Sequence, residues 1–557
     1  MPIASIHCYL KQLYKNKAAK PKIRTASYYF CFMYLFLKHR WPLFLVLLVF
    51  IICKIPHLSY SYYWDESWPY APAIREMYNH GISIMPTAVE SELSRGHPLF
   101  FHAIAAMWMH IFGNSFIAMH SFALFISLLF LITIYEAGLK IFNKRVAVLA
   151  LLLVASQELF FVQSSYVLME ILVAFLAFAS LYFYVREKYL LTILTLSALF
   201  YTKESGLIMG AVLGLDAFFS LLSKEGFSRK NIFRVLSVAA PCLLIGIFFL
   251  IQKHIRGWYI FPFYSELIEH SWKAFWYKFR MSCVRYSFYE NNKYLDMLLL
   301  LILSIVAAIK QKKAGYLILW LPGAIIYYYV DDLRAGRLLP SVPFFIVFVI
   351  SLWCMLYTFR RIKLYENKEQ QKFIELSTCF IFSFLCFSAT NFLTYRYLLA
   401  DIVPLLFFAA FIVTRFSDLS YKWIWYPATA MILFISFYAF YHNPLYGGDT
   451  DMAGFKGIKI QKNLADFLEK NNYYDSSICC GSFMEKEHLI DPNTGFLKSQ
   501  KAFKNVKWEL DASTAFIVFD SMEYDYRYKQ VISQPNFHLV YRTQEGKLWG
   551  EIYQQQK

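Results

Sequence analysis

Asp65 and Glu66 are the first acidic residues of the 557-residue chain, which has no Asp or Glu in residues 1–64. They stand among aromatic side chains in SYYWDESWPY at 61–70. Aromatic groups of this kind favour a membrane interface, where a carboxylate is partly desolvated. We expect Asp65 to act in chemistry and Glu66 to support it; the alternative is a plain solvated loop with two acids. We also expect substrate contacts from three aromatic neighbours, Tyr63, Trp68 and Tyr70.

A third carboxylate, Glu170, lies within the apolar stretch SSYVLMEILVAF at 164–175. An ionisable group about one turn inside an apolar helix is costly unless it is paired or hydrated. Glu170 is therefore a candidate for the same site as Asp65. The alternative is a hydrogen bond between two helices.

Three basic residues complement these acids: Lys203 in FYTKESG, Arg337 in DDLRAGRLLP and Arg396 in TYRYLLAD. All three map to helix ends on the same side of the membrane as Asp65. A guanidinium binds two phosphate oxygens at once, whereas an ammonium acts as a point charge. A single Arg at this depth usually anchors a helix at the interface. Several cations on the face that carries the acid pair predict a site for an anionic headgroup.

The elements that position these residues are expected to be membrane helices. The chain is 58% hydrophobic, with a mean hydropathy of +0.41. Runs such as WPLFLVLLVFIICKI at 41–55 are apolar on every side, which is typical of helices solvated by lipid. The net charge of +17 resides mostly in short loops between such runs. Loop charges of this kind report topology, so we expect no nucleic-acid partner.

The positive-inside rule places the basic leader, residues 1–40, in the cytoplasm and residues 57–114 in a first external loop. We predict thirteen spanning helices within a transmembrane catalytic domain at 41–441. This count treats 97–113 as a juxtamembrane helix; if that segment spans, the count is fourteen. The C-terminus is then on the external side.

Residues 442–557 are charged and mixed in composition and predict a small external α/β domain. Apolar residues in 458–471 recur at helical spacing, and four later segments are typical of strands: 476–483, 515–520, 536–542 and 547–554. The vicinal Cys479 and Cys480 are expected to lie half-buried in the first strand. Asp449 and Asp451 form a DxD in a Gly-rich stretch, which we interpret as turn chemistry rather than a metal site.

Two stretches of the first external loop, DESWPYAPAIREMYNHG at 65–81 and RGHPLFFHAIAAMW at 95–108, resemble the first external loop of GT-C membrane glycosyltransferases. They are similar in particular to lipid A aminoarabinose transferases and protein O-mannosyltransferases. FVQSSYVLMEI, YTKES and GRLLPSVP follow in the family's order, so the resemblance covers most of 57–345.

The resemblance implies residue roles. Asp65 matches the acid that the family uses beside the acceptor, Glu66 completes the pair, and Glu170 matches a second acid near the site. Lys203 and Arg337 match basic positions near the donor phosphate, with Arg396 as a further candidate.

One departure concerns the phosphate. Aminoarabinose transferases usually carry Lys-Pro-Pro-Leu where this chain has Gly-His-Pro-Leu at 96–99. A lysine is therefore missing, and we expect Arg95 or His97 to take its place at the donor phosphate.

The family's activity implies transfer of a sugar from a polyprenyl-phosphate donor to lipid A, a glycan or a protein hydroxyl, with inversion, at the outer face of a bacterial cytoplasmic (inner) membrane. Membrane lipid is the remaining partner. We expect no cofactor, because the ligand spacing does not support a divalent cation. The alternative function is transport of a lipid or lipid-linked sugar without glycosyl transfer.

Overall fold

The computed structural model describes residues 40–279 apart from 224 and 225, residues 365–417 apart from 392 and 393, and residues 447–556 apart from 524. Positions 305, 308, 309 and 312 are also described. The chain groups into two compact units, Met1–Phe50 and Ile51–Lys557. The site lies wholly within the second unit. The domain boundaries expected from the sequence stay predictions.

Six helices in the described part of the chain are long and apolar enough to cross a membrane. The prediction of a helical, multi-pass membrane protein agrees with this finding, whereas the count of thirteen spans stays a prediction because several expected spans lie outside the described residues. The six segments are Arg40–His57, Phe116–Phe142, Glu204–Leu221, Arg229–Arg256, Lys368–Thr390 and Tyr395–Arg415.

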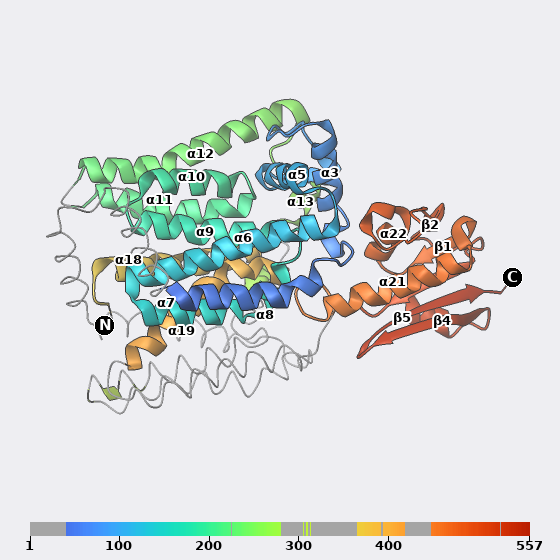
Figure 1. Ribbon diagram of the computed structural model, residues 1–557. Coiled ribbons are helices and arrows are strands. Elements are labelled where there is room, and N and C mark those ends of the chain that lie inside the picture. The colour runs from blue at the N-terminus through green and yellow to red at the C-terminus, as the bar shows by residue number, and fades with distance from the viewer. Residues whose placement is uncertain are drawn as a thin grey trace, which may run out of the picture. The chain divides into compact units, whose positions relative to one another are not determined.

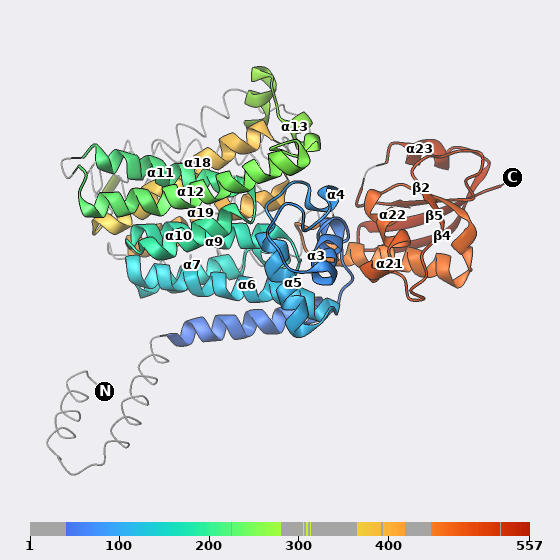
Figure 2. The same cartoon turned by 90° about the horizontal axis from the view of Figure 1, so that it is seen from above.

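Helix α5 (Phe100–Phe112) has 13 residues and is too short to span. At about 1.5 Å per residue it covers roughly 20 Å, against about 30 Å of hydrocarbon. Gly113 ends it with a φ of 88°, a conformation that favours glycine. This length agrees with a juxtamembrane helix at 97–113. In both views α5 lies beside α3 (Tyr70–His80) at one end of the longer helices (Figures 1 and 2).

The remaining helices of the apolar region run mostly alongside one another (Figure 1). Local signals set several of their starts: the Ser115 side chain accepts from Ala118 N at the start of α6, and Asn143 accepts from two backbone amides of α7. Their bounds are α4 (Ser91–Ser94), α6 (Phe116–Ala137), η3 (Gly138–Phe142), α7 (Lys144–Ala155), α8 (Glu158–Gln163), α11 (Leu207–Leu221), α12 (Arg229–Arg256), α13 (Pro262–Leu267) and α18 (Lys368–Thr390).

Three short turns of helix meet at one end of this bundle. Helices α9 (Met169–Val185) and α10 (Tyr189–Phe200) pack as neighbours joined by only three residues, so the start of α9 lies near the end of α10. The turn η4 (Glu204–Gly206) follows α10. The turn η6 (Tyr395–Leu398) leads into α19 (Leu399–Ser417), which packs against α7 and α9. The turn η2 (Trp64–Glu66) precedes α3.

The C-terminal region holds a five-stranded sheet in the order β2-β1-β3-β5-β4. Strand β1 (Ser477–Cys480) is parallel to β2 (Asn505–Lys507) and β3 (Phe516–Asp520). Strand β5 (Leu548–Gln555) is antiparallel to β3 and to β4 (Phe537–Glu545). The four predicted strands are confirmed, and β2 is an addition. Cys479 and Cys480 lie in β1 as expected, but both are fully buried rather than half-buried, because the sheet and its helices cover them.

Helix α21 (Gly454–Lys470) packs on β4 and β5 and confirms the helix predicted at 458–471. Gly550 permits this close approach, because a Cβ there would meet Ile460 and Leu464 at 2.7 Å. Helices α22 (Phe483–Ile490) and α23 (Arg527–Ile532) complete the region, which lies at the right of Figure 1 in orange and red.

Candidate functional site

Arg396 is the centre of the site. Its side chain is 4% exposed and pairs with carboxylates from three distant segments. Its NH2 group donates to Asp65 Oδ2 and its NH1 group to Asp449 Oδ2. Its Nε lies 3.4 Å from Glu170 Oε1. The guanidinium fork, which presents several donors in one plane, is suited to this three-way contact. Asp65, Glu170 and Arg396, all predicted from the sequence, are thus brought together.

Lys203 forms the second cationic point of the cluster. Its Nζ donates to Glu170 Oε1 over 2.9 Å and lies 4.0 Å from the centre of the Tyr397 ring. Burial alone would lower the pKa of the Lys203 ammonium, but the Glu170 carboxylate beside it outweighs this effect and raises the pKa. Lys203 therefore stays charged at neutral pH.

The three carboxylates differ in access. Glu170 and Asp449 are each 4% exposed, whereas 23% of the Asp65 side chain is exposed. Asp65 is therefore the acid of this cluster that an incoming group can reach. Burial raises the pKa of Asp449 to about 6, although Arg396 opposes the shift. Asp449 is thus ionised at neutral pH and becomes neutral in mildly acidic solution.

Glu66 has a structural role in this arrangement. It has no exposed surface, and its two oxygens accept from the backbone amides of Tyr63 at 3.2 Å and Val167 at 2.6 Å. His120 Nε2 lies 3.2 Å from Oε1. Because Val167 precedes Glu170 by three residues, Glu66 ties the turn that carries Asp65 to the start of α9. This placement agrees with the expected supporting role.

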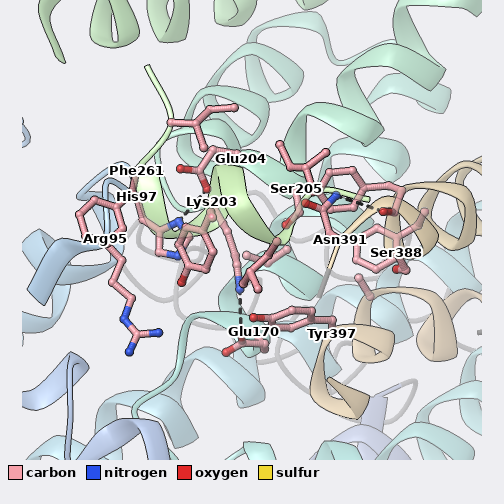
Figure 3. A pocket seen from close by; sticks show the side chains of 18 residues that line it. Arg95, His97, Glu170, Lys203, Glu204, Ser205, Phe261, Ser388, Asn391 and Tyr397 are labelled. Atoms are coloured by element: carbon pink, nitrogen blue, oxygen red, sulfur yellow. Dashed lines mark hydrogen bonds and ion pairs between the residues drawn. The ribbon is translucent and has the colours of Figure 1, made fainter. Parts of the chain in front are cut away.

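A pocket of about 180 Å³ opens beside the cluster (Figure 3). Glu170, Lys203 and Tyr397 form part of its wall, and Arg95 and His97 form another part. The pocket has a polar wall and an apolar wall. The apolar wall comes from α13, α18 and the residues next to them: Ile260, Phe261, Leu267, Ile268, Phe384 and Phe387.

The structure explains the missing lysine of the first loop. Gly96 has a φ of +72°, and a Cβ there would meet the Trp258 ring at 2.8 Å and Phe261 Cβ at 3.1 Å. No side chain fits at Gly96 while these aromatics stay in place. Arg95 and His97, on either side, both line the pocket, and the Arg95 guanidinium lies 4.7 Å from the centre of the Trp68 ring.

The three aromatic residues expected at the substrate are placed differently. Tyr63 is fully buried and donates to Gly447 O over 2.5 Å, so it offers no surface to a substrate. Tyr70 is also buried, with its ring against Phe101. Both placements depart from the expectation, because these side chains fill the interior between the first loop and its neighbours. Trp68 is half-buried beneath Arg95.

Sequence reasoning missed Asp449 as a member of the site. Its only signal was the DxD, which was attributed to turn chemistry. Asp451 does form such a turn, since its Oδ1 accepts from Ala453 N. Asp449 instead pairs with Arg396, 53 residues earlier in the chain. Arg337, the other predicted phosphate ligand, lies outside the described residues.

No protein-family model matches the sequence, and no curated protein matches it. Among solved structures, the chain is similar to ArnT from Cupriavidus metallidurans bound to undecaprenyl phosphate. The TM-score is 0.46 at 11% identity, over 91% of this chain and 97% of that one. It is also similar to the oligosaccharyltransferase AglB from Archaeoglobus fulgidus in complex with an inhibitory peptide and a dolichol-phosphate. There the TM-score is 0.43 at 11% identity, over 92% of this chain and 74% of that one.

The arrangement can hold an anion and place a base beside it. Lys203, Arg95 and His97 supply positive or hydrogen-bonding groups in the pocket, while Arg396 orients carboxylates behind its wall. The apolar wall suits a hydrocarbon chain attached to that anion. Asp65, on the accessible side of Arg396, is placed to accept a proton from a second reactant.

Proposed function

We propose that this protein transfers a sugar from a polyprenyl-phosphate donor to a hydroxyl acceptor on lipid A, a glycan or a protein. The observation that carries the proposal is the two-sided pocket, whose cationic wall at Lys203 and Arg95 faces an apolar wall from α13 and α18. A lipid phosphate needs both kinds of wall. The order of motifs in the sequence supports the same reaction.

The reaction is a single inverting displacement. The acceptor hydroxyl attacks the anomeric carbon while Asp65 takes its proton, and the bond from that carbon to the phosphate oxygen breaks. The leaving polyprenyl phosphate gains negative charge, which Lys203 and the other cations of the pocket stabilise. Arg396 keeps Asp65 oriented, and Glu170 holds Lys203 in place. Arg337 remains a proposed contact of the donor phosphate, whereas the expected phosphate contact of Arg396 gives way to a positioning role, because its guanidinium faces three carboxylates and it does not line the pocket.

The donor and the acceptor approach from different sides. Glu170 and Lys203 belong to the wall of the pocket, where the donor phosphate would lie. Asp65 lies beyond Arg396 and reaches open surface. We place this face on the outer side of the cytoplasmic membrane, with the N-terminus in the cytoplasm and the C-terminus outside. The positive charges of the leader and the short loops support this orientation.

The test is transfer by the purified protein in lipid nanodiscs, with a panel of radiolabelled polyprenyl-phosphate sugars and hydroxyl acceptors. We expect the wild type to form labelled product and release unlabelled polyprenyl phosphate. Asp65→Asn should reduce the rate by about 10² to 10⁴, the usual contribution of a general base. Glu92→Gln, which changes an exposed carboxylate of the same loop, is the matched control and should keep full activity.

Full activity in the Asp65→Asn variant would overturn the assignment of the base. Movement of intact labelled donor across the membrane without product would instead favour the transporter alternative. Since all the charges that the mechanism uses belong to side chains, transfer should persist in a chelator.

A further inference from the structure

His97 and Glu204 form a second pair of a basic side chain and a carboxylate on the pocket wall, beside the pair of Lys203 and Glu170. Nδ1 of His97 lies 2.7 Å from Glu204 Oε2, and the imidazole is 8% exposed. Figure 3 shows this contact above the pair of Lys203 with Glu170, with both pairs among the residues that line the pocket.

The chain fixes this pair from two segments. His97 follows Gly96, which lets Trp258 and Phe261 pack over the turn, and its ring lies 5.2 Å from the ring of Tyr264. Glu204 is the residue after Lys203, so the two carboxylate pairs share one short turn of the chain. A carboxylate that accepts from Nδ1–H fixes the orientation of the imidazole ring and leaves Nε2 as the ring nitrogen that can exchange a proton.

We propose that His97, held by Glu204, is the general acid that protonates the leaving lipid phosphate. This role rests on the proposed glycosyl transfer. As the bond from the anomeric carbon to the phosphate oxygen breaks, the Nε2–H of the His97 imidazolium is donated to a phosphate oxygen. The lipid leaves as a singly charged phosphate monoester, and His97 becomes neutral.

Protons balance over the cycle. Asp65 gains the proton of the acceptor hydroxyl, and His97 loses one to the phosphate. Asp65 then releases its proton to water and His97 takes one up, which restores the starting state. Because the donor is a phosphodiester and the product is a monoester, only the product has an oxygen that needs this proton.

The charged and titratable groups around His97 are consistent with an acid at this point. The Glu204 carboxylate lies 2.7 Å from Nδ1 of the imidazole. Lys203 and Arg95 line the same pocket, and Glu170 already partners Lys203. The Tyr264 ring lies beside the imidazole at a tilt of 33°, and His102 from α5 is fully buried, where burial lowers its pKa to about 3 and keeps it neutral.

Two variants test this role in the purified protein. His97→Gln should lower kcat by about 10², with a smaller change in KM, and should remove the basic limb that a general acid gives to the wild-type kcat profile. Glu204→Gln keeps the imidazole and should therefore lower kcat less and keep a basic limb. A purely structural role would lower activity equally at every pH. His80→Gln, at an exposed histidine of α3, is the control.

A second readout is binding of polyprenyl phosphate itself, which His97→Gln should weaken about tenfold at pH 6. Wild-type values of both kcat and binding in His97→Gln, while Asp65→Asn stops transfer, would overturn the acid role and leave the proposed function standing. Absence of transfer by the wild type with every donor would overturn both.

Discussion

Arg396 concentrates more of the site's charge contacts than any other described residue. It lies between the accessible Asp65 and the buried Glu170 and Asp449. Removing one partner of a buried ion pair leaves the remaining charges without compensation, which typically costs about 3–5 kcal/mol. Its guanidinium therefore has a structural role and a positioning role at once, and two substitutions separate them.

Arg396→Gln should destabilise the fold by about 3–5 kcal/mol, because three carboxylates lose their counter-charge. Arg396→Lys should keep most of that stability, since it retains the charge, yet reduce transfer at least tenfold because an ammonium cannot hold Asp65 and Asp449 in one plane. Thermal unfolding and transfer assays on both variants measure this separation. Equal activity of Arg396→Lys and wild type would contradict the positioning role.

Asp449 predicts a dependence of donor binding on pH. At neutral pH the three carboxylates exceed Arg396 and Lys203 by one negative charge. When pH falls through about 6, Asp449 becomes neutral and the cluster loses that excess. A phosphodiester keeps its charge in this range, so its binding should tighten about three- to tenfold between pH 7.5 and 5.

Donor binding is measured at pH 7.5 and pH 5 in the His97→Gln variant and in the double variant His97→Gln/Asp449→Asn. Both lack the His97 imidazole, so its titration does not contribute to the difference. The double variant should bind the donor equally well at both pH values. A pH dependence that persists in the double variant would assign the effect to another group.

At the scale of elements, short helices create the recess for the site. Helix α9, of 17 residues, begins at the turn that carries Glu170, and helix α10, of 12 residues, ends three residues before Lys203. The segment around α13 lines the pocket at the same place. Gly96 is the point at which Trp258 and Phe261 approach the first loop. The aromatic segment therefore depends on one residue without a side chain.

Gly96→Ala should disturb this contact, because its φ of +72° disfavours other residues and the new Cβ would clash with Trp258. We expect a loss of about 1–3 kcal/mol in stability and a rise in the donor KM. Gly81→Ala, where φ is also positive but no atom lies within 4 Å of the added Cβ, is the control for backbone strain alone. A donor KM that changes equally in both variants would contradict a specific role for the packing.

At the scale of the whole molecule, the C-terminal region supports the turn that carries Asp65. Tyr62 N donates to Thr494 O over 2.9 Å, and Arg75 pairs with Asp491 at 2.7 Å. His488 Nε2 lies 2.7 Å from Ser67 Oγ, two residues after Asp65. Through these contacts, and through the pairing of Asp449 with Arg396, the C-terminal region helps to hold the site in place.

His488 should make the stability of the folded protein depend on pH. Burial lowers its pKa well below the ordinary value, so the folded protein keeps it neutral while the unfolded chain binds a proton below about pH 6.5. Stability should therefore fall as pH decreases below 6.5, by about 1.4 kcal/mol per pH unit for this one group. His488→Gln should show a shallower decline in melting temperature between pH 6.5 and 5. Parallel declines in the two proteins would contradict this assignment.

The sequence was sufficient for the class of protein and for the strands and helix of the C-terminal region. It also singled out four charged residues near helix ends that the structure brings together. Asp65, Glu170, Lys203 and Arg396 are unusual because charge is costly in apolar segments, and that cost makes them visible without a structure. Asp449 and Glu204 were not identified as site residues, since an acid in a polar stretch is ordinary until its distant partner is known. Tyr63 and Tyr70 are buried instead of lining the pocket. Tyr63 lies in a run of three buried residues, 61–63, that has neither a helical nor a strand period, and Tyr70 begins the buried face of α3.

The central claim is that Asp65 acts as the base of a glycosyl transfer whose donor is held on the other side of Arg396. The most direct measurement compares donor binding with single-turnover transfer in wild type and Asp65→Asn, using the donor that the wild type uses best. We expect Asp65→Asn to bind the donor at least as tightly as the wild type and up to about tenfold tighter, since it removes one negative charge from the cluster and Asp65 is not among the residues that line the pocket, and to transfer at least 10² times more slowly. Transfer at the wild-type rate with unchanged donor binding would contradict the account.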